Sequence, residues 1–157
     1  QDRKNGFLKG FLSIVPTATV AQAVDGSAVI DKATVAAADM LQAHPEINVI
    51  FGINNDSSLG ALAALRAAGL YSADWGVVAS VDGSEPIMKE LGDPASPHKA
   101  ESGYPPYDFS IATFNLLGAA VDGKADAKSQ VVVSYPPVDP TAKGIDAWLS
   151  RQYPRAQ

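Results

Sequence analysis

The sequence predicts an α/β protein built on a parallel sheet, and two observations support this fold class. Short apolar runs that suit buried strands alternate with segments whose apolar residues recur at helical spacing. The clearest of these runs close on a polar turn that leads into a helix. Such alternation implies right-handed crossovers and parallel strands. A length of 157 residues suits one domain, or one domain with an appendage.

The individual elements follow from apolar spacing and from the residues that interrupt it. In chain order, the predicted elements are a helix over residues 4–14, a strand over 19–24, a helix over 30–41, a strand over 47–53, a helix from Ser57 or Ser58 to Ala68, a strand over 75–81, a helix over 86–91, a short strand over 99–103, a helix from Asp108 or Ser110 to Val121, a strand over 130–133 and a helix over 142–150.

Turn and cap residues set the boundaries in the first half of the chain. Pro16 ends the first helix, and Asp25-Gly26 follows the weakly alternating strand. Ser27 is expected to cap the next helix, which is the clearest amphipathic segment. The apolar face of this helix consists of Ile30, Ala33, Ala37, Met40 and Leu41.

The next two strands are apolar runs of the kind that a sheet buries on both sides. The first run leads into a helix that Gly69 ends, and the second closes on Asp82-Gly83. Two proline breaks, at residues 104–106 and 136–137, then divide the chain into a long α/β part and a smaller returning part.

Composition excludes several classes of function. The net charge is −5 and the 12 Lys and Arg residues are scattered along the chain, so nucleic-acid binding is not expected. The absence of Cys excludes disulfides, thiolate metal sites and Cys nucleophiles. No apolar run approaches the roughly 18 residues that a membrane helix needs.

Motifs of catalysis are missing as well. The sequence has no HExxH, Walker, GxGxxG or GxSxG pattern. His44 precedes a proline and His98 lies in a proline-rich stretch, where a helix-end or surface role is expected of both. The sequence therefore predicts no enzyme, no catalytic residues, no cofactor and no metal site.

Polar residues that follow the predicted strands are the candidates for ligand binding, because open parallel sheets bind ligands outside the carboxyl ends of their strands. They are Asn54, Asn55, Asp56, Asp82 and Tyr104. Carboxylates and amides at one edge can recognise a polyol, since the carboxylate accepts hydroxyl protons and the amide both donates and accepts. The alternative is that each residue serves a turn or caps a helix.

Four segments match a familiar pattern. They are Arg3 to Phe7, Leu41 to Phe51, Asn54 to Ala61, and Val77 to Gly83. Together these segments resemble the type I periplasmic sugar-binding proteins of the ribose-binding kind, which share their fold with the ligand domains of lactose-repressor-like regulators. The resemblance implies α/β lobes that clamp a sugar between them.

Relative to that family, the chain lacks the N-terminal lobe and the first strand of the C-terminal lobe. The implied fold is therefore an incomplete, flavodoxin-like parallel-sheet lobe. Residues 1–103 match the C-terminal lobe, residues 104–135 match a segment that crosses back to build the N-terminal lobe, and residues 136–157 match the return segment and the C-terminal helix.

The resemblance also implies roles for individual residues. Gln1 or Arg3 would bind sugar oxygens, Asn54 matches the amide ligand of the family, and Asp82 matches the carboxylate that grips hydroxyls. Tyr104 stands at the hinge position. These five residues form the expected ligand-binding set.

The leading hypothesis is a solute-binding subunit of a bacterial ABC importer for a sugar or polyol, present as a truncated or nicked C-terminal portion. It would act in the periplasm or outside the cell, with a lipid anchor before processing as one option. The alternative is the effector domain of a sugar-responsive transcription regulator, which an upstream helix-turn-helix would reveal. A third hypothesis, a small flavodoxin-like enzyme, remains open because fold does not dictate function.

The expected partners are a sugar or polyol, the membrane permease of the importer, and either the missing N-terminal half as a second chain or a second copy of this chain. The reason for a protein partner is the helix that ends at Val121. Its apolar face should pack on the absent lobe, so that Ile111, Phe114 and Leu117 would be exposed in the chain alone. With roughly half of the sugar contacts missing, the isolated chain should bind sugar weakly.

Overall fold

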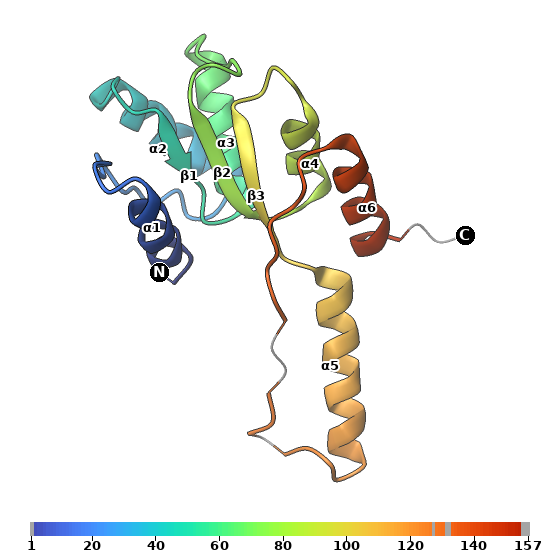
Figure 1. Cartoon of the computed structure of the whole chain (residues 1–157). Helices are drawn as coiled ribbons and strands as arrows, with labels where there is room; N and C mark the ends of the chain where they lie inside the picture. Colours follow the sequence, from blue (N-terminus) through green and yellow to red (C-terminus); the bar gives the residue numbers. More distant parts are fainter. Residues whose placement is uncertain (1, 127, 131–132, 155–157) are drawn as a thin grey trace.

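The computed structural model describes residues 2–126, 128–130 and 133–154 (Figure 1). In chain order the elements are α1 (Asp2–Ile14), α2 (Ile30–Ala43), β1 (Val49–Phe51), α3 (Asn55–Ala67), β2 (Val77–Asp82), α4 (Glu85–Gly92), β3 (His98–Gly103), α5 (Pro106–Val121) and α6 (Ala142–Gln152). The predicted α/β class is confirmed.

Parallel pairing organises the sheet. In the described part of the chain, three strands lie in the order β1-β2-β3, and both pairs are parallel. Val49 lies opposite Val77 in the first pair, and Ser80 lies opposite Glu101 in the second. The strands run in the same direction, so their carboxyl ends all point toward one edge of the sheet.

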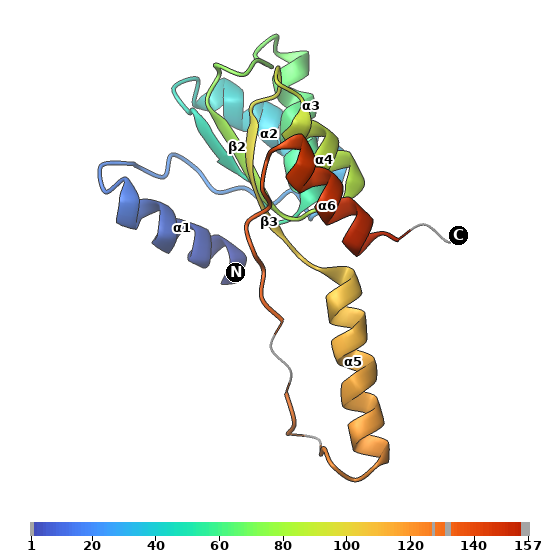
Figure 2. The ribbon, with the colours of Figure 1, turned by 45° about the vertical axis from the view of Figure 1, so that its right-hand side comes forward.

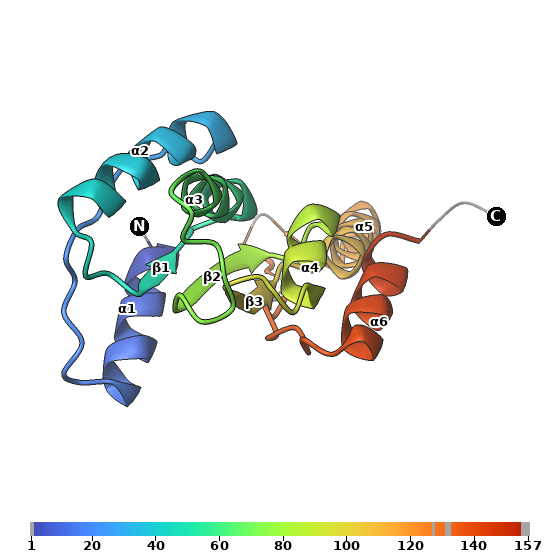
Figure 3. The same cartoon turned by 90° about the horizontal axis from the view of Figure 1, so that it is seen from above.

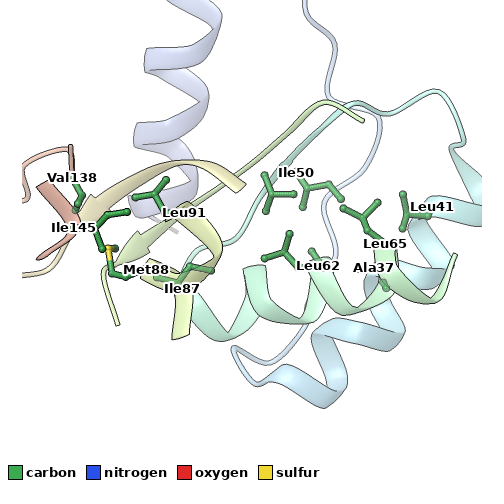
Figure 4. Packing of buried hydrophobic residues seen from close by; sticks show 13 residues of the cluster. Ala37, Leu41, Ile50, Leu62, Leu65, Ile87, Met88, Leu91, Val138 and Ile145 are labelled. Atoms are coloured by element: carbon green, nitrogen blue, oxygen red, sulfur yellow. The ribbon is translucent and has the colours of Figure 1, made fainter. Parts of the chain in front are cut away.

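Helices cover the two faces of the sheet unequally. Figure 3 shows α2 and α3 together on one face and α1 on the other. On the α1 side, the Phe7 ring stacks on Phe51 with 4.2 Å between centroids. On the other side, Leu62 and Leu65 of α3 are fully buried and face Ile50 of the sheet (Figure 4). The hydrophobic core therefore lies mainly between α3 and the sheet.

The core continues under α4, where Ile87 and Met88 are fully enclosed, and reaches Ile145 of α6. Pro86 lies in the first turn of α4, where the lack of an N–H costs nothing. Burying side chains of this size stabilises the fold by about 1.5–3 kcal/mol each. The α/β body, defined as the sheet with α2, α3, α4 and α6, is therefore well packed.

The strand predicted over residues 19–24 is wrong. These residues form no strand, and among the described residues no strand runs beside them. A strand is stable when its N–H and C=O groups find partners in a ladder, which weak alternation of side chains does not supply. The strand predicted over 47–53 does form, with Val49–Phe51 as β1, and Asn48 and Gly52 on either side also make backbone hydrogen bonds to β2.

Two predicted helix caps are also wrong. Val29, not Ser27, is the residue before the first turn of α2, and Ser27 lies in the preceding turn with φ 53°. Helix α3 starts after Asn54 instead of at Ser57 or Ser58. The first turn thus begins later than predicted in α2 and earlier than predicted in α3, where the Asn54 side chain accepts from the Ser57 N–H.

A helical arm extends away from the body. We define the arm as α5 together with the described residues that return from it to Pro137 (Figures 1 and 2). Every residue of α5 is described, and none of them is buried. Phe114 is 72 % exposed and Val121 is 88 % exposed, as the sequence predicts for a chain without the other lobe. Residues 131–132 of the strand predicted over 130–133 lie outside the described residues.

The arm joins the body where the chain crosses itself. Ser102 and Pro137 form an antiparallel bridge, and the Gly103 N–H donates to the Pro136 carbonyl at 2.8 Å. The outgoing and returning segments are thus held side by side at the end of β3. Of the helices that the structure describes, none combines the length and apolar character that a membrane crossing requires.

Candidate functional site

The candidate site lies at the edge where β2 and β3 end. Asp82 is the last residue of β2, and Tyr104 directly follows β3. The Tyr104 N–H donates to the Asp82 carbonyl at 2.8 Å, which joins the two strand ends. The fold therefore brings together two of the residues that the sequence analysis selected.

Arg3 reaches the same edge from the first turn of α1. Its Nη1 atom lies 2.9 Å from Oδ1 of Asp82 and donates to the Ile53 carbonyl, also at 2.9 Å. The side chains of Arg3 and Asp82 are 40 % and 31 % exposed, respectively. Partly exposed ion pairs contribute at most about 1 kcal/mol, so a ligand could rearrange this pair at low cost. Gln1 lies outside the described residues.

Burial shifts the pKa of two acidic groups of the site in the same direction. Burial raises the pKa of the Asp82 carboxyl, although Arg3 and the Asn55 N–H act in the opposite direction. Burial also raises the pKa of the Tyr104 hydroxyl, which is thus protonated at neutral pH and can donate a hydrogen bond. The edge therefore presents an acidic acceptor, a cationic donor and a phenol.

Aromatic rings line the site on the side of the arm. The Tyr104 ring lies 5.3 Å from the ring of Tyr135 and 5.4 Å from that of Phe109, between centroids. The Arg3 guanidinium lies 6.0 Å from the centre of the Tyr135 ring. Aromatic faces of this kind can stack on the C–H face of a sugar.

Tyr135 was not selected from the sequence. A signal was nevertheless present, because the chain contains the tripeptide Tyr-Pro-Pro twice, at residues 104–106 and at residues 135–137. The structure sets the two copies side by side, with the Ser102 hydroxyl donating to the Tyr135 carbonyl at 3.2 Å. The repeated tripeptide thus marks the crossing of the outgoing and returning chains.

Asn54 makes the contacts of a helix cap. Its Oδ1 accepts from the N–H of Ser57 at 3.0 Å and from the Ser57 hydroxyl at 2.6 Å, and its Nδ2 donates to the Ala28 carbonyl at 3.1 Å. A cap of this kind stabilises a helix by about 1 kcal/mol. In the structure the Asn54 side chain therefore caps α3. That Asn54 also binds the ligand stays a prediction.

Asn55 is buried beneath the edge. It is 3 % exposed, and its side chain bonds to Ser80, Val81, Ser84 and Glu101 instead of facing solvent. Glu101 is a second residue that the sequence analysis missed, since a lone Glu in a short strand resembles a solvated surface residue. Within the described residues, no group of three or more His, Cys, Asp or Glu side chains could hold a metal ion.

A family model matches residues 3–95, and its description is periplasmic binding proteins and sugar binding domain of the LacI family. The match covers more than half of the chain. The chain belongs to this family. By sequence, no curated protein matches the chain significantly.

Solved structures of this family share the fold. A protein from Mycobacterium smegmatis in complex with β-D-fucofuranose is 26 % identical, with a TM-score of 0.82 over 97 % of this chain and 48 % of its own. The arabinose-transporter binding protein from Shewanella sp. ANA-3, bound to L-arabinofuranose, is 20 % identical, with a TM-score of 0.75 over 92 % and 48 %. A galactofuranose-binding protein is 19 % identical, with a TM-score of 0.82 over 96 % and 50 %.

The chain therefore spans about half the length of these family members. Its parallel sheet and helices correspond to a portion of the type I periplasmic binding protein fold.

Proposed function

We propose that the chain is the C-terminal portion of a solute-binding subunit that delivers a sugar or polyol to a bacterial ABC importer. The observation that carries the proposal is the Arg3–Asp82 pair beside the Tyr104 ring, at the carboxyl edge of a sheet with this family's fold. Three structural relatives were solved with a furanose or named as furanose binders, which supports a small sugar as the ligand.

Each group has a task in this proposal. The Asp82 carboxylate accepts hydrogen bonds from two sugar hydroxyls, and Arg3 donates to a ring or hydroxyl oxygen. The Tyr104 ring packs against the apolar C–H face of the sugar. Asn54 and Gln1 complete the proposed ligand-binding set. The chain would bind its ligand without converting it.

The domain assignment is part of the proposal. Residues 1–103 form the C-terminal lobe without its first strand, residues 104–135 cross toward the N-terminal lobe, and residues 136–157 return from it. In this arrangement the exposed arm packs against the N-terminal half, supplied by a second chain or replaced by a second copy. The complete protein acts in the periplasm or outside the cell, with the importer permease as its membrane partner, and a lipid anchor before processing is compatible with this.

The effector domain of a sugar-responsive regulator is the second candidate. One observation favours keeping it, since the description of the matching family includes the sugar binding domain of the LacI family. The sugar site would be the same in both cases. The coding sequence upstream of this chain distinguishes them, because an export leader supports the importer and a basic helix-turn-helix supports the regulator.

A binding titration tests the proposed site. L-Arabinose, D-galactose, D-fucose and D-allose are titrated by calorimetry into the chain combined with the N-terminal half of its parent protein. We expect one sugar to bind, and Asp82→Asn to weaken its binding at least tenfold, since a carboxylate that accepts two hydroxyls is lost.

Asp39→Asn is the matched control, because Asp39 is an exposed carboxylate in the C-terminal half of α2, whereas the loop before this helix bonds to Asn54 through Ala28. Equal affinity of the Asp82→Asn variant and the unchanged protein would refute the site. The isolated chain should bind the same sugar more weakly than the combined protein, since it offers only part of the contacts.

A further inference from the structure

A buried carboxylate lies directly beneath the candidate site. Glu101 of β3 is 3 % exposed, and its side chain is completely enclosed. It therefore cannot touch a ligand in the way that Asp82 can. Burying a carboxylate is costly unless hydrogen bonds satisfy its oxygens, so its partners indicate its purpose.

The partners of Glu101 come from several elements around the site. Its Oε1 accepts from the Gly83 N–H and from Asn55 Nδ2, both at 2.8 Å. Its Oε2 accepts from the Ser80 hydroxyl at 2.5 Å and lies 3.2 Å from His98 Nε2. One side chain thus connects β2, β3, the start of α3 and the turn that follows β2.

Asn55 extends this network around the turn. Its Oδ1 accepts from the Ser84 N–H at 2.7 Å, and its Nδ2 also donates to the Val81 carbonyl at 3.0 Å. Its own N–H points at Oδ2 of Asp82, at 3.4 Å. Glu101, through Gly83 and Asn55, therefore holds the backbone on both sides of Asp82.

The turn needs to be held, because its backbone is in an unfavourable conformation. Asp82 has φ 134° and Gly83 has φ 85°, and a positive φ is rarely adopted by a residue with a side chain. Such a conformation is strained and persists when its surroundings enforce it. The direction of the Asp82 carboxylate depends on this backbone.

Trp148 of α6 grips the same turn from the opposite side. Its Nε1 donates to the Gly83 carbonyl at 2.8 Å. Its ring lies 2.8 Å from the position that a Cβ atom on Gly83 would occupy, so only glycine fits there. Gly83 is thus fixed by Glu101 at its N–H and by Trp148 at its carbonyl.

We propose that Glu101 is a positioning residue for sugar recognition, which holds Gly83 and Asn55 so that the strained Asp82-Gly83 turn directs the Asp82 carboxylate to the ligand. Trp148 is the second residue that fixes the turn. The positioning role of Glu101 rests on the proposed sugar site, but its effect on the rigidity of the turn is measurable without any sugar. Glu101 acts through Asp82 and makes no contact with the ligand.

Hydrogen exchange measured by NMR on the 157-residue chain tests the hold. Glu101→Gln preserves the shape of the side chain but replaces an accepting oxygen by a donating amide. We expect exchange of the Gly83 and Ser84 amides to be at least tenfold faster, with the core amides of Leu62 and Leu65 unchanged.

Glu90→Gln is the matched control. Glu90 also accepts several hydrogen bonds, from Arg66, Tyr71 and Ser96, but it lies on α4 away from the site. This variant should leave Gly83 exchange unchanged. Trp148→Phe keeps an aromatic ring but removes the N–H donor together with part of the ring surface that packs on Gly83 and Gly103, so it should speed exchange at the turn as well. Unchanged Gly83 exchange in Glu101→Gln, or in Trp148→Phe should the first variant not fold, would overturn the proposal.

A double-mutant cycle then separates positioning from general stability. Whichever of L-arabinose, D-galactose, D-fucose and D-allose binds most tightly in the calorimetric titration is used as the probe. It is titrated by NMR into the chain combined with the N-terminal half of its parent protein, and into the same complex carrying Glu101→Gln, Asp82→Asn or both. We expect Glu101→Gln to weaken binding about tenfold when Asp82 is present and to have no further effect when it is replaced.

An equal loss in both backgrounds would mean that Glu101 serves only the stability of the fold, which overturns the positioning role. Absence of binding by all four sugars to the combined protein would count against the proposed sugar site. Hydrogen exchange at Gly83 would then decide by itself whether Glu101 holds the turn.

Discussion

Helices α3 and α5 are both rich in apolar residues, yet one lies in a core and the other in solvent. In α3, Leu62 and Leu65 are completely buried against the sheet. In α5, Phe114 and Leu117 are 72 % and 57 % exposed. The comparison teaches that apolar composition gives a helix a face that can be buried. That face becomes part of a core only where another apolar surface packs against it.

The attachment of the two helices to the body also differs. Helix α3 contacts α2 and two strands. The start of α5 is tied to α6 by polar contacts, since Asp108 accepts from Arg151 and from Gln152 Nε2. The arm is thus anchored at its base by a few hydrogen bonds, whereas its apolar length faces outward.

The largest expected contrast is in stability. Leu65→Ala should lower the free energy of unfolding of the chain by about 2–5 kcal/mol, because it removes buried methyl groups and leaves a cavity. In the monomeric chain, at protein concentrations too low for assembly, Phe114→Ala should change it by less than about 0.5 kcal/mol, because the ring is already exposed. Urea denaturation measures both. A loss of several kcal/mol for Phe114→Ala would contradict the comparison.

Covering the arm should reduce this contrast. We expect the chain to form a dimer in solution, or to bind the separately produced N-terminal half of its parent protein. Each apolar side chain of α5 that becomes buried would contribute about 1.5–3 kcal/mol. Native mass spectrometry measures the assembly, and Phe114→Asp should weaken it at least tenfold.

Val35→Asp is the matched control, since Val35 is an apolar residue on α2, outside the arm, with 63 % exposure against 72 % for Phe114. If the chain stays monomeric both alone and in the presence of the N-terminal half, the prediction that the arm packs against a second chain is wrong.

The smallest expected effect is on how stability depends on pH, to which two carboxylates should contribute with opposite sign. Burial raises the pKa of Asp82 in the body, whereas hydrogen bonds from Arg151 and Gln152 lower the pKa of Asp108 at the base of the arm. A carboxyl group whose pKa is higher in the folded than in the unfolded state stabilises the fold at pH values below its pKa in the unfolded state. This stabilisation is lost as the pH rises through its pKa in the folded state. A lowered pKa contributes stability above the unfolded pKa, and it is lost as the pH falls through the folded pKa.

Asp82→Asn should therefore be more favourable for stability, relative to the unchanged chain, at about pH 7 than at about pH 4. The effect of Asp108→Asn on the free energy of unfolding should be less favourable at neutral pH than at low pH. Urea denaturation of both variants across this pH range measures the two slopes. Slopes of the same sign would show that the surroundings assigned to one of the carboxylates are wrong.

Local patterns were enough to predict most helices and their ends. The apolar spacing that starts at Ile30 predicts α2, and Gly69, with φ 71°, ends the helix of Leu62 as expected. The edge position of Asp82 followed from the apolar strand that precedes it. These features depend on neighbours in the sequence, which is why they can be derived from it.

The failures concern contacts between distant residues. The segment over 19–24 alternates weakly like a strand, but pairing is decided by what lies beside it. Glu101 resembles a surface residue in the sequence, and it is buried because Asn55 and Gly83 supply its donors from other elements. Tyr135 reaches Tyr104 because the returning chain crosses the outgoing one.

The sequence by itself thus determined the α/β class, the family resemblance and the residues at the ends of the strands. Periodicity, turn residues and caps are local properties, because they depend on residues that are close together in the sequence. Only the tertiary structure decided that Asn54 caps a helix, that Glu101 and Trp148 hold the Asp82-Gly83 turn, and that the apolar face of α5 lies in solvent. The physical reason is that burial and hydrogen-bond partnership are relations between surfaces far apart in the sequence, which exist only once the chain has folded.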